Sequence, residues 1–229
     1  MKNKLLFYFQ FLLTALNYLF NKNFNEKQII NKHLNNESIV FDVGSNVGAY
    51  TKFVSNTLKN KKIYFHSFEP NNELCTIQDK IKFPDHHSLL INNRAISNKA
   101  ETFIFYERSI SSHSSLIENP QIDGLSKTIS EYEVETLTLE KYCKVNDINN
   151  IDLLKIDAEG LDYEVLISAG NLLINRNIKL IKIEIFFNNQ NLSKISSLLE
   201  QNNYELIGLT NLSYFNGKLE FADAYFSLN

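Results

Sequence analysis

The chain has 229 residues, of which 44% are hydrophobic and 21% are charged, so it can bury one substantial core and is most simply one main domain. Its 23 basic and 26 acidic side chains give a formal net charge of −3, which excludes the basic excess that supports non-specific nucleic-acid binding. Cys75 and Cys143 lack the spacing of a zinc site or a disulfide framework. Because free thiols are typical of a reducing compartment, they favour a cytoplasmic protein.

The first 22 residues differ from the rest. Two lysines precede an apolar stretch whose polar side chains recur at helical spacing, namely Gln10, Thr14, Asn17 and Asn21. The stretch is shorter than the ~20 residues that a membrane-spanning helix needs, and no small-residue cleavage site of a secretory signal follows it. We therefore predict an amphipathic helix over 1–22, ahead of a domain over 23–229. Two roles stay open for it: peripheral contact with a membrane surface, or docking on the domain or on a partner.

From residue 38 onward, short apolar runs alternate with helix-like segments, which is typical of a parallel sheet with crossover helices. The expected strands are 39–43, 62–68, 88–92, 101–107, 133–138, 151–156, 178–185, 204–209 and 221–228. The expected helices end near Leu58, begin near Asn72 and Leu161, and cover about 191–201. The Asn216–Gly217 pair predicts the turn of a closing antiparallel hairpin. The pattern predicts a Rossmann-like, mostly parallel α/β sheet that ends in this hairpin.

The Ser-rich stretch 109–130 separates two of these strands and contains Pro120 and Gly124. Turn-forming residues at this density predict a loop. A loop of this length inside a compact domain is often a lid or a binding loop.

The segment 41–48 predicts a strand, a glycine turn and the start of a helix, a unit that holds nucleotides beyond the carboxyl ends of parallel strands. A dinucleotide site requires G-x-G-x-x-G, but Asn46 takes the place of the middle glycine and Gly48 comes one residue early. Asp42 also directs a negative charge to the place where a pyrophosphate would lie. A carboxylate there suits a cationic nucleoside, which favours S-adenosyl-L-methionine with its ammonium and sulfonium groups.

Acidic side chains occur at the ends of several predicted parallel strands: Asp42, Glu69, Asp157 and Glu184. Because the carboxyl ends of such strands meet at one edge of the sheet, we expect these groups to converge on one crevice. A single acid at such a junction is as often a helix N-cap as a ligand-binding group. Glu69 follows the second strand, where an acid commonly binds a ribose hydroxyl pair. Asn93 follows the third strand, where it could hydrogen-bond to an adenine edge or simply stabilise the turn.

Several motifs follow one another in the order of a known family: Phe41–Gly48, Phe68–Pro70, Asn93–Ser97, Ser114–Leu116, Leu154–Gly160, Glu164, Gly170 and Ile183–Glu184. From about 40 to 227 the chain resembles the FkbM-type family of S-adenosylmethionine-dependent methyltransferases. The resemblance implies a class I methyltransferase fold and methyl transfer to a hydroxyl of a sugar, a glycan or a small natural product. It implies cofactor contacts for Asp42, Gly44, Gly48 and Glu69, and a cofactor or catalytic role for Asp157 and Glu159. Asn46 in the glycine turn, and Asn93 and Ala95 after the third strand, are further candidates because of where they lie. The expected cofactor-binding residues are therefore Asp42, Gly44, Asn46, Gly48, Glu69, Asn93 and Ala95.

Methyl transfer to a hydroxyl requires that its proton be removed, and the candidate bases are Asp157, Glu159, His113 and Lys155. His113 has a suitable intrinsic pKa and lies on the Ser-rich loop, at a place where family members often have Gly or Ser. Asp157 could equally hold the cofactor's ammonium, and Lys155 could form a salt bridge to a neighbouring acid. The alternative route is Mg²⁺ held by Asp157, Glu159 and Glu184.

Two other functions stay open at this point. A degenerate methyltransferase fold could act as a membrane-associated binding module, although the complete set of acids argues against it. An NAD-dependent oxidoreductase could use Glu69 on a ribose, although Asn46 and Asp42 argue against a pyrophosphate. The expected partner is a sugar-containing or small-molecule acceptor, and not a nucleic acid.

Overall fold

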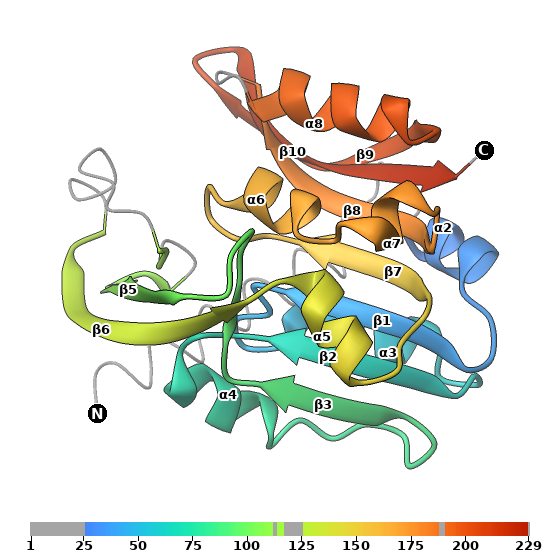
Figure 1. Cartoon of the computed structure of the whole chain (residues 1–229), viewed down its shortest axis with the longest axis horizontal. Coiled ribbons are helices and arrows are strands. Elements are labelled where there is room, and N and C mark those ends of the chain that lie inside the picture. Colours follow the sequence, from blue (N-terminus) through green and yellow to red (C-terminus); the bar gives the residue numbers. More distant parts are fainter. Residues whose placement is uncertain (1–25, 112–113, 117–125, 188–190, 229) are drawn as a thin grey trace.

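The computed structural model describes residues 26–111, 114–116, 126–187 and 191–228 (Figure 1). The predicted amphipathic helix over 1–22 and the candidate base His113 lie outside the described residues. Part of the predicted loop over 109–130 does so as well.

A seven-stranded sheet forms the centre of the molecule, with the strand order β3-β2-β1-β7-β8-β10-β9 (Figure 1). Five of its strands are parallel: β1 Ser38–Val43, β2 Ile63–Phe68, β3 Ser88–Asn92, β7 Ile151–Ile156 and β8 Ile178–Phe186. The last two form an antiparallel hairpin: β9 Tyr204–Phe215 and β10 Lys218–Leu228. Asn216 and Gly217 have φ angles of 48° and 75°, as a type I′ hairpin turn requires. The predicted fold class is confirmed.

A smaller three-stranded sheet with the order β4-β6-β5 stands beside the central sheet. Its strands are β4 Ala95–Ile96, β5 Thr102–Arg108 and β6 Thr128–Leu137. Figure 1 shows β5 and β6 extending to one side of the molecule. Strand β4 was not predicted from the sequence, because a strand of two residues is too short to show an alternating pattern. The predicted start of β6 was five residues too late.

Helices cover both faces of the central sheet (Figure 1). Two helices pack on one face, which we call the α3 face: α2 Glu26–His33 and α3 Ala49–Thr57. Four pack on the other: α5 Leu139–Val145, α6 Asp162–Ile167, α7 Asn171–Ile174 and α8 Asn191–Gln201. Helix α4, Asn72–Gln78, contacts β3. Neither α2 nor α5 was predicted. Among the described residues, no helix is both long and apolar enough to cross a bilayer.

Alternate residues of the central strands point to opposite faces, so each face has its own apolar core. Phe41 and Leu154 belong to the core under α5 to α8, whereas Val40 and Leu153 belong to the core under α2 and α3. The register pairs Asp42 with Lys155 and Lys155 with Lys182. These three polar side chains therefore form one row on the α3 face, near the carboxyl ends of their strands.

Candidate functional site

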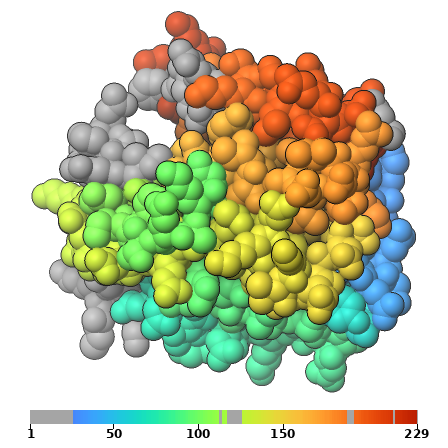
Figure 2. Space-filling view, viewed as in Figure 1, coloured from blue at the N-terminus to red at the C-terminus, as the bar shows by residue number. Residues whose placement is uncertain are grey.

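A cavity lies at the carboxyl ends of β1, β2 and β7, and the smaller sheet contributes to its wall. In the space-filling view, the green segment of the smaller sheet lies against the light-orange segment that follows β7 (Figure 2). Apolar side chains from four segments form part of the lining, namely Phe68, Ile96, Phe105 and Leu116. Several predicted site residues also line it, namely Gly44, Asn46, Glu69, Ala95, Asp157 and Glu159. The structure thus brings together the glycine turn, the end of β2 and the Asp157–Gly160 segment.

The glycine turn closes tightly against the end of β7. Gly44 has a φ of 69°, and a Cβ added there would stand 1.8 Å from the carbonyl oxygen of Asp157. The N–H groups of Gly44 and Ser45 both donate to the carbonyl of Phe68 at 3.1 Å. The three strand ends are therefore joined by backbone contacts that leave no room for a side chain at position 44.

Glu69 is buried with its carboxylate at the cavity, and its side chain is held by backbone donors. Its Oε2 accepts from the N–H of Asn46 at 2.8 Å, and its Oε1 accepts from the N–H of Asn71 at 2.9 Å. Burial raises the pKa of Glu69 to about 7, against the opposing effect of these two hydrogen bonds. A carboxylate has about four lone-pair directions, so two remain for hydroxyl groups of a ligand.

Asp42 lies behind the cavity and does not line it. Its side chain is 1% exposed, and its Oδ2 accepts from the N–H and the hydroxyl of Thr51 at 3.2 and 2.7 Å. Its Oδ1 forms an ion pair with the ammonium of Lys155 at 3.1 Å. The expectation that Asp42 presents its charge to a ligand does not match this placement, because the carboxylate is used within the protein.

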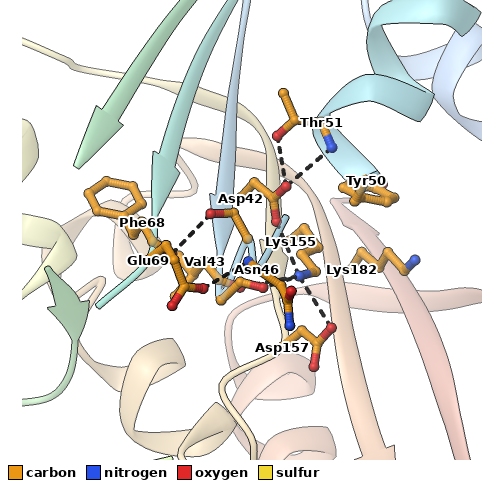
Figure 3. Close-up of polar contacts among 12 residues, drawn as sticks. Asp42, Val43, Asn46, Tyr50, Thr51, Phe68, Glu69, Lys155, Asp157 and Lys182 are labelled. Atoms are coloured by element: carbon orange, nitrogen blue, oxygen red, sulfur yellow. Dashed lines mark hydrogen bonds and ion pairs between the residues drawn. The ribbon is translucent and has the colours of Figure 1, made fainter. Parts of the chain in front are cut away.

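Lys155 lies between two carboxylates, and the expectation of a catalytic base does not match its environment either (Figure 3). Its Nζ is 3.1 Å from Asp42 and 3.2 Å from Asp157, and it donates to the carbonyl of Gly44 at 2.9 Å. An ammonium stabilised by two carboxylates already carries its proton and has no lone pair with which to accept another.

Gly48 and Asn93 lie outside the cavity lining. Gly48 has a φ of 73° and precedes α3, and a Cβ there would stand 2.7 Å from the side chain of Ile81. Asn93 donates to the carbonyls of Glu69 and Pro70 at 3.0 and 2.8 Å, which is the turn role that the sequence left open. Both residues shape the segments that line the cavity.

Asp157 and Glu159 both line the cavity, but their environments differ. Asp157 is 37% exposed and pairs with Lys155. Glu159 has a φ of 50°, and its carbonyl accepts from the hydroxyl of Ser115 at 2.9 Å. Burial, followed by the negative charges of Asp157 and Asp162, raises the pKa of Glu159 well above its usual range. A carboxyl whose pKa is raised holds a proton more readily, so Glu159 is a candidate base at the cavity.

Glu184 lies within β8 and does not line the cavity. Burial, with the negative charge of Asp157 next, raises its pKa well above the usual range. In the described part of the chain, no group of three or more His, Cys, Asp and Glu side chains is placed to hold a metal ion. The set of Asp157, Glu159 and Glu184 that the sequence suggested for Mg²⁺ is thus not assembled as a metal site.

Several residues at the site were not predicted, and no motif marks Gln78 or Asn71. Gln78 is fully buried and donates to the hydroxyl of Ser45 at 2.8 Å and to the carbonyl of Asn46 at 2.6 Å. Asn71 holds Glu69 through its N–H and also caps α4. Ser115 belongs to the family motif Ser114–Leu116. This motif was the one indication in the sequence that Ser115 lies at the site, where its hydroxyl contacts Glu159.

Known proteins show the same domain. The family model described as the methyltransferase FkbM domain matches residues 42–206. No match is found among the curated proteins. In structure, the chain is similar to methyltransferase FkbM from Methylobacillus flagellatus, with a TM-score of 0.52 and 13% identity over 83% of this chain and 43% of that one. The chain thus spans less than half the length of that protein.

Two further solved structures have lower scores. The precorrin-6y C5,15-methyltransferase of Geobacter metallireducens has a TM-score of 0.47 and 13% identity, over 89% of this chain and 87% of that one. An rRNA methylase of Streptococcus thermophilus has a TM-score of 0.48 and 13% identity, over 89% of this chain and 94% of that one. These scores are too low to bear on function. The family match covers most of the chain, and the chain belongs to the FkbM methyltransferase domain family.

Proposed function

We propose that the protein is an S-adenosyl-L-methionine-dependent O-methyltransferase whose acceptor is a hydroxyl of a sugar, a glycan or a small natural product. The observation that carries the proposal is the cavity itself. In a chain of this family, it combines the glycine turn, a buried carboxylate after β2 and two carboxylates after β7.

The lining has suitable groups for the ribose and the adenine of the cofactor. Glu69 retains acceptor capacity for a ribose hydroxyl pair, since its two bound N–H donors leave two lone-pair directions. The apolar surface of Ile96, Phe105 and Leu116 would hold the adenine. The cofactor supplies the methyl group, and its sulfide is the leaving group.

Glu159 is the base in this proposal. With the cofactor bound, the Glu159 carboxylate would accept the proton that the acceptor hydroxyl loses as it takes up the methyl group. A base is most effective when its pKa approaches the working pH, and the raised pKa of Glu159 moves it in that direction. Asp157 is already paired with Lys155, so we assign it to positioning rather than to proton transfer.

Calorimetry with S-adenosylhomocysteine tests the cofactor. At a pH above the raised pKa of Glu69, we expect the wild-type chain to bind and Glu69→Gln to bind at least about tenfold more weakly, because a charged acceptor is lost. Glu73→Gln should bind as wild type. Glu73 is the matched control, because it lies four residues away and is exposed. Absence of binding to the wild type, together with protection from thermal unfolding by NAD, would replace this proposal with the oxidoreductase.

Transfer of a labelled methyl group to a panel of free sugars, glycans and hydroxylated natural products tests the acceptor. We expect label on oxygen, stable to conditions that cleave esters, and loss of labelling in Glu159→Gln. Label on nitrogen or on carbon would contradict O-methylation. If the wild type transfers no label to any acceptor, and Glu159→Gln supports the protein's role in the cell as well as the wild type does, the membrane-associated binding module is favoured.

A further inference from the structure

Lys155 connects two segments of the cavity wall from behind. Its ammonium contacts the carboxylate of Asp42 at the end of β1 and the carboxylate of Asp157 just after β7. It also donates to the carbonyls of Gly44 and Val43 at 2.9 and 3.4 Å. Figure 3 shows the side chain between the two carboxylates, and it is 4% exposed.

These contacts couple the glycine turn to the Asp157 segment. Asp42 also fixes the first turn of α3 through Thr51, so the ammonium lies at a junction of β1, α3 and β7. The N–H of Asp157 donates to the carbonyl of Val43 at 3.2 Å, the same carbonyl that Lys155 contacts. Gly44 and Asp157 are in backbone contact. A displacement of either segment therefore displaces the other.

Lys182 is a matched reference on the neighbouring strand. It is paired with Lys155 in the β7–β8 register and is 2% exposed. Two carboxylates hold it too, Glu26 at 3.1 Å and Asp223 at 2.9 Å, and its Nζ lies 4.3 Å from the centre of the Tyr50 ring. Its ammonium points toward Tyr50 and away from the carboxylates of Asp42 and Asp157 (Figure 3). It does not line the cavity.

We propose that Lys155 is a positioning residue: its ammonium holds the glycine turn and the Asp157 carboxylate in one fixed arrangement at the cavity. The consequence of this arrangement for catalysis rests on the proposed function. The arrangement itself can be tested in the ligand-free protein. Lys182 stabilises the fold in a comparable way and has no part in that arrangement.

Amide hydrogen exchange of the ligand-free protein is the first test. The N–H groups of Gly44, Ser45, Asn46 and Asp157 are hydrogen-bonded, so their exchange reports opening of the two segments. In Lys155→Met we expect exchange in 44–48 and 157–161 to be at least about tenfold faster, because a charge-assisted contact is lost. Lys182→Met should speed exchange in these segments by no more than its loss of global stability accounts for. Equal protection of both segments in wild type and Lys155→Met overturns the proposal.

A double variant separates positioning from stability. Removing Lys155 alone leaves the Asp42 carboxylate buried without its cation, which destabilises the fold. Lys155→Met combined with Asp42→Asn removes that charge, so we expect stability to recover while fast exchange at 157–161 remains. Recovery of slow exchange in the double variant shows a merely structural role and overturns the inference.

Affinity for S-adenosylhomocysteine is the second readout. We expect the double variant to bind at least about tenfold more weakly than the wild type, and Lys182→Met to bind within about threefold of it. If the wild type fails to bind, the proposed function fails, while the exchange experiment still decides the role of Lys155. If the wild type binds and the double variant binds equally well, the inference fails and the proposed function stands.

Discussion

The carbonyl oxygen of Asp157 lies 1.8 Å from the point where a Cβ on Gly44 would stand. Two segments separated by more than a hundred residues are thus in backbone contact at the cavity. The contact explains why a glycine occupies this position, in addition to its φ of 69°.

Gly44→Ala should therefore separate the glycine turn from the end of β7. We expect binding of S-adenosylhomocysteine to weaken by more than about tenfold and the free energy of unfolding to fall by at least about 2 kcal/mol, because backbone atoms must move. Gly217→Ala is the matched control, since Gly217 has a φ of 75° and nothing lies within 4 Å of its added Cβ. Calorimetry and denaturant unfolding check both variants. Equal effects would show that φ alone, and not the contact with Asp157, requires glycine.

The buried carboxyl of Glu69 should make stability depend on pH. Burial raises its pKa from 4.5 to about 7, so the folded chain holds this proton more tightly than the unfolded chain does. The contribution of Glu69 is therefore most favourable below pH 4.5 and is lost as the pH rises through about 7. The change amounts to at most about 3 kcal/mol.

Urea unfolding at a series of pH values isolates this contribution. We expect the stability of the wild type relative to Glu69→Gln to decrease between pH 4 and pH 8, while its stability relative to Glu73→Gln stays constant. Only the slope with pH matters, because replacing the carboxylate also shifts stability by a constant amount. A flat difference for Glu69→Gln would contradict a raised pKa.

Glu159→Gln should reduce turnover by about 10²- to 10⁴-fold, which is the usual contribution of a positioned base. Affinity for S-adenosylhomocysteine should change by less than about threefold, since the defect lies in the chemical step. The wild-type rate should rise with pH as the raised pKa of Glu159 is passed, and this limb should be absent from the variant. Glu164→Gln is the control, and a similar defect in both variants would remove Glu159 from proton transfer.

The segment 1–22 should bind lipid surfaces if it forms the predicted amphipathic helix. We expect the full chain to sediment with vesicles that contain anionic lipids, and a chain that starts at residue 23 to stay in the supernatant. Raising the salt concentration should weaken sedimentation, because lysines contribute to it. Equal sedimentation of the two chains would leave docking on the domain or on a partner as the role of the segment.

The sequence predicted the central sheet well because its strands are short apolar runs bounded by polar turns. Strands β3 and β7 begin and end at the predicted residues. Helix α5, with seven residues, was missed although Thr138 caps it. Strand β4 has only two residues and forms only through pairing with β6.

The site was predicted in part, for a related reason. Position at a strand end placed Glu69 and Asp157 at the cavity correctly, because parallel strands share one edge. Position alone did not show that Asp42 faces Lys155, since this depends on the register that pairs them across β1 and β7. The hydroxyl of Ser115 reaches Glu159 over 44 residues of sequence, and such a distance leaves no local pattern.

Because Asp42, Lys155 and Lys182 form a row on one face only, the two faces of the central sheet should differ in how far amino-acid substitutions destabilise the fold. On the α3 face, each charge depends on its neighbours, so a single substitution leaves an unmatched ion in a dry interior. On the opposite face, around Ile195 and Leu199, the packing is apolar and a swap of similar volume is mild. Thermal tolerance is therefore best engineered under α8, where new side chains leave the electrostatics of the cavity unchanged.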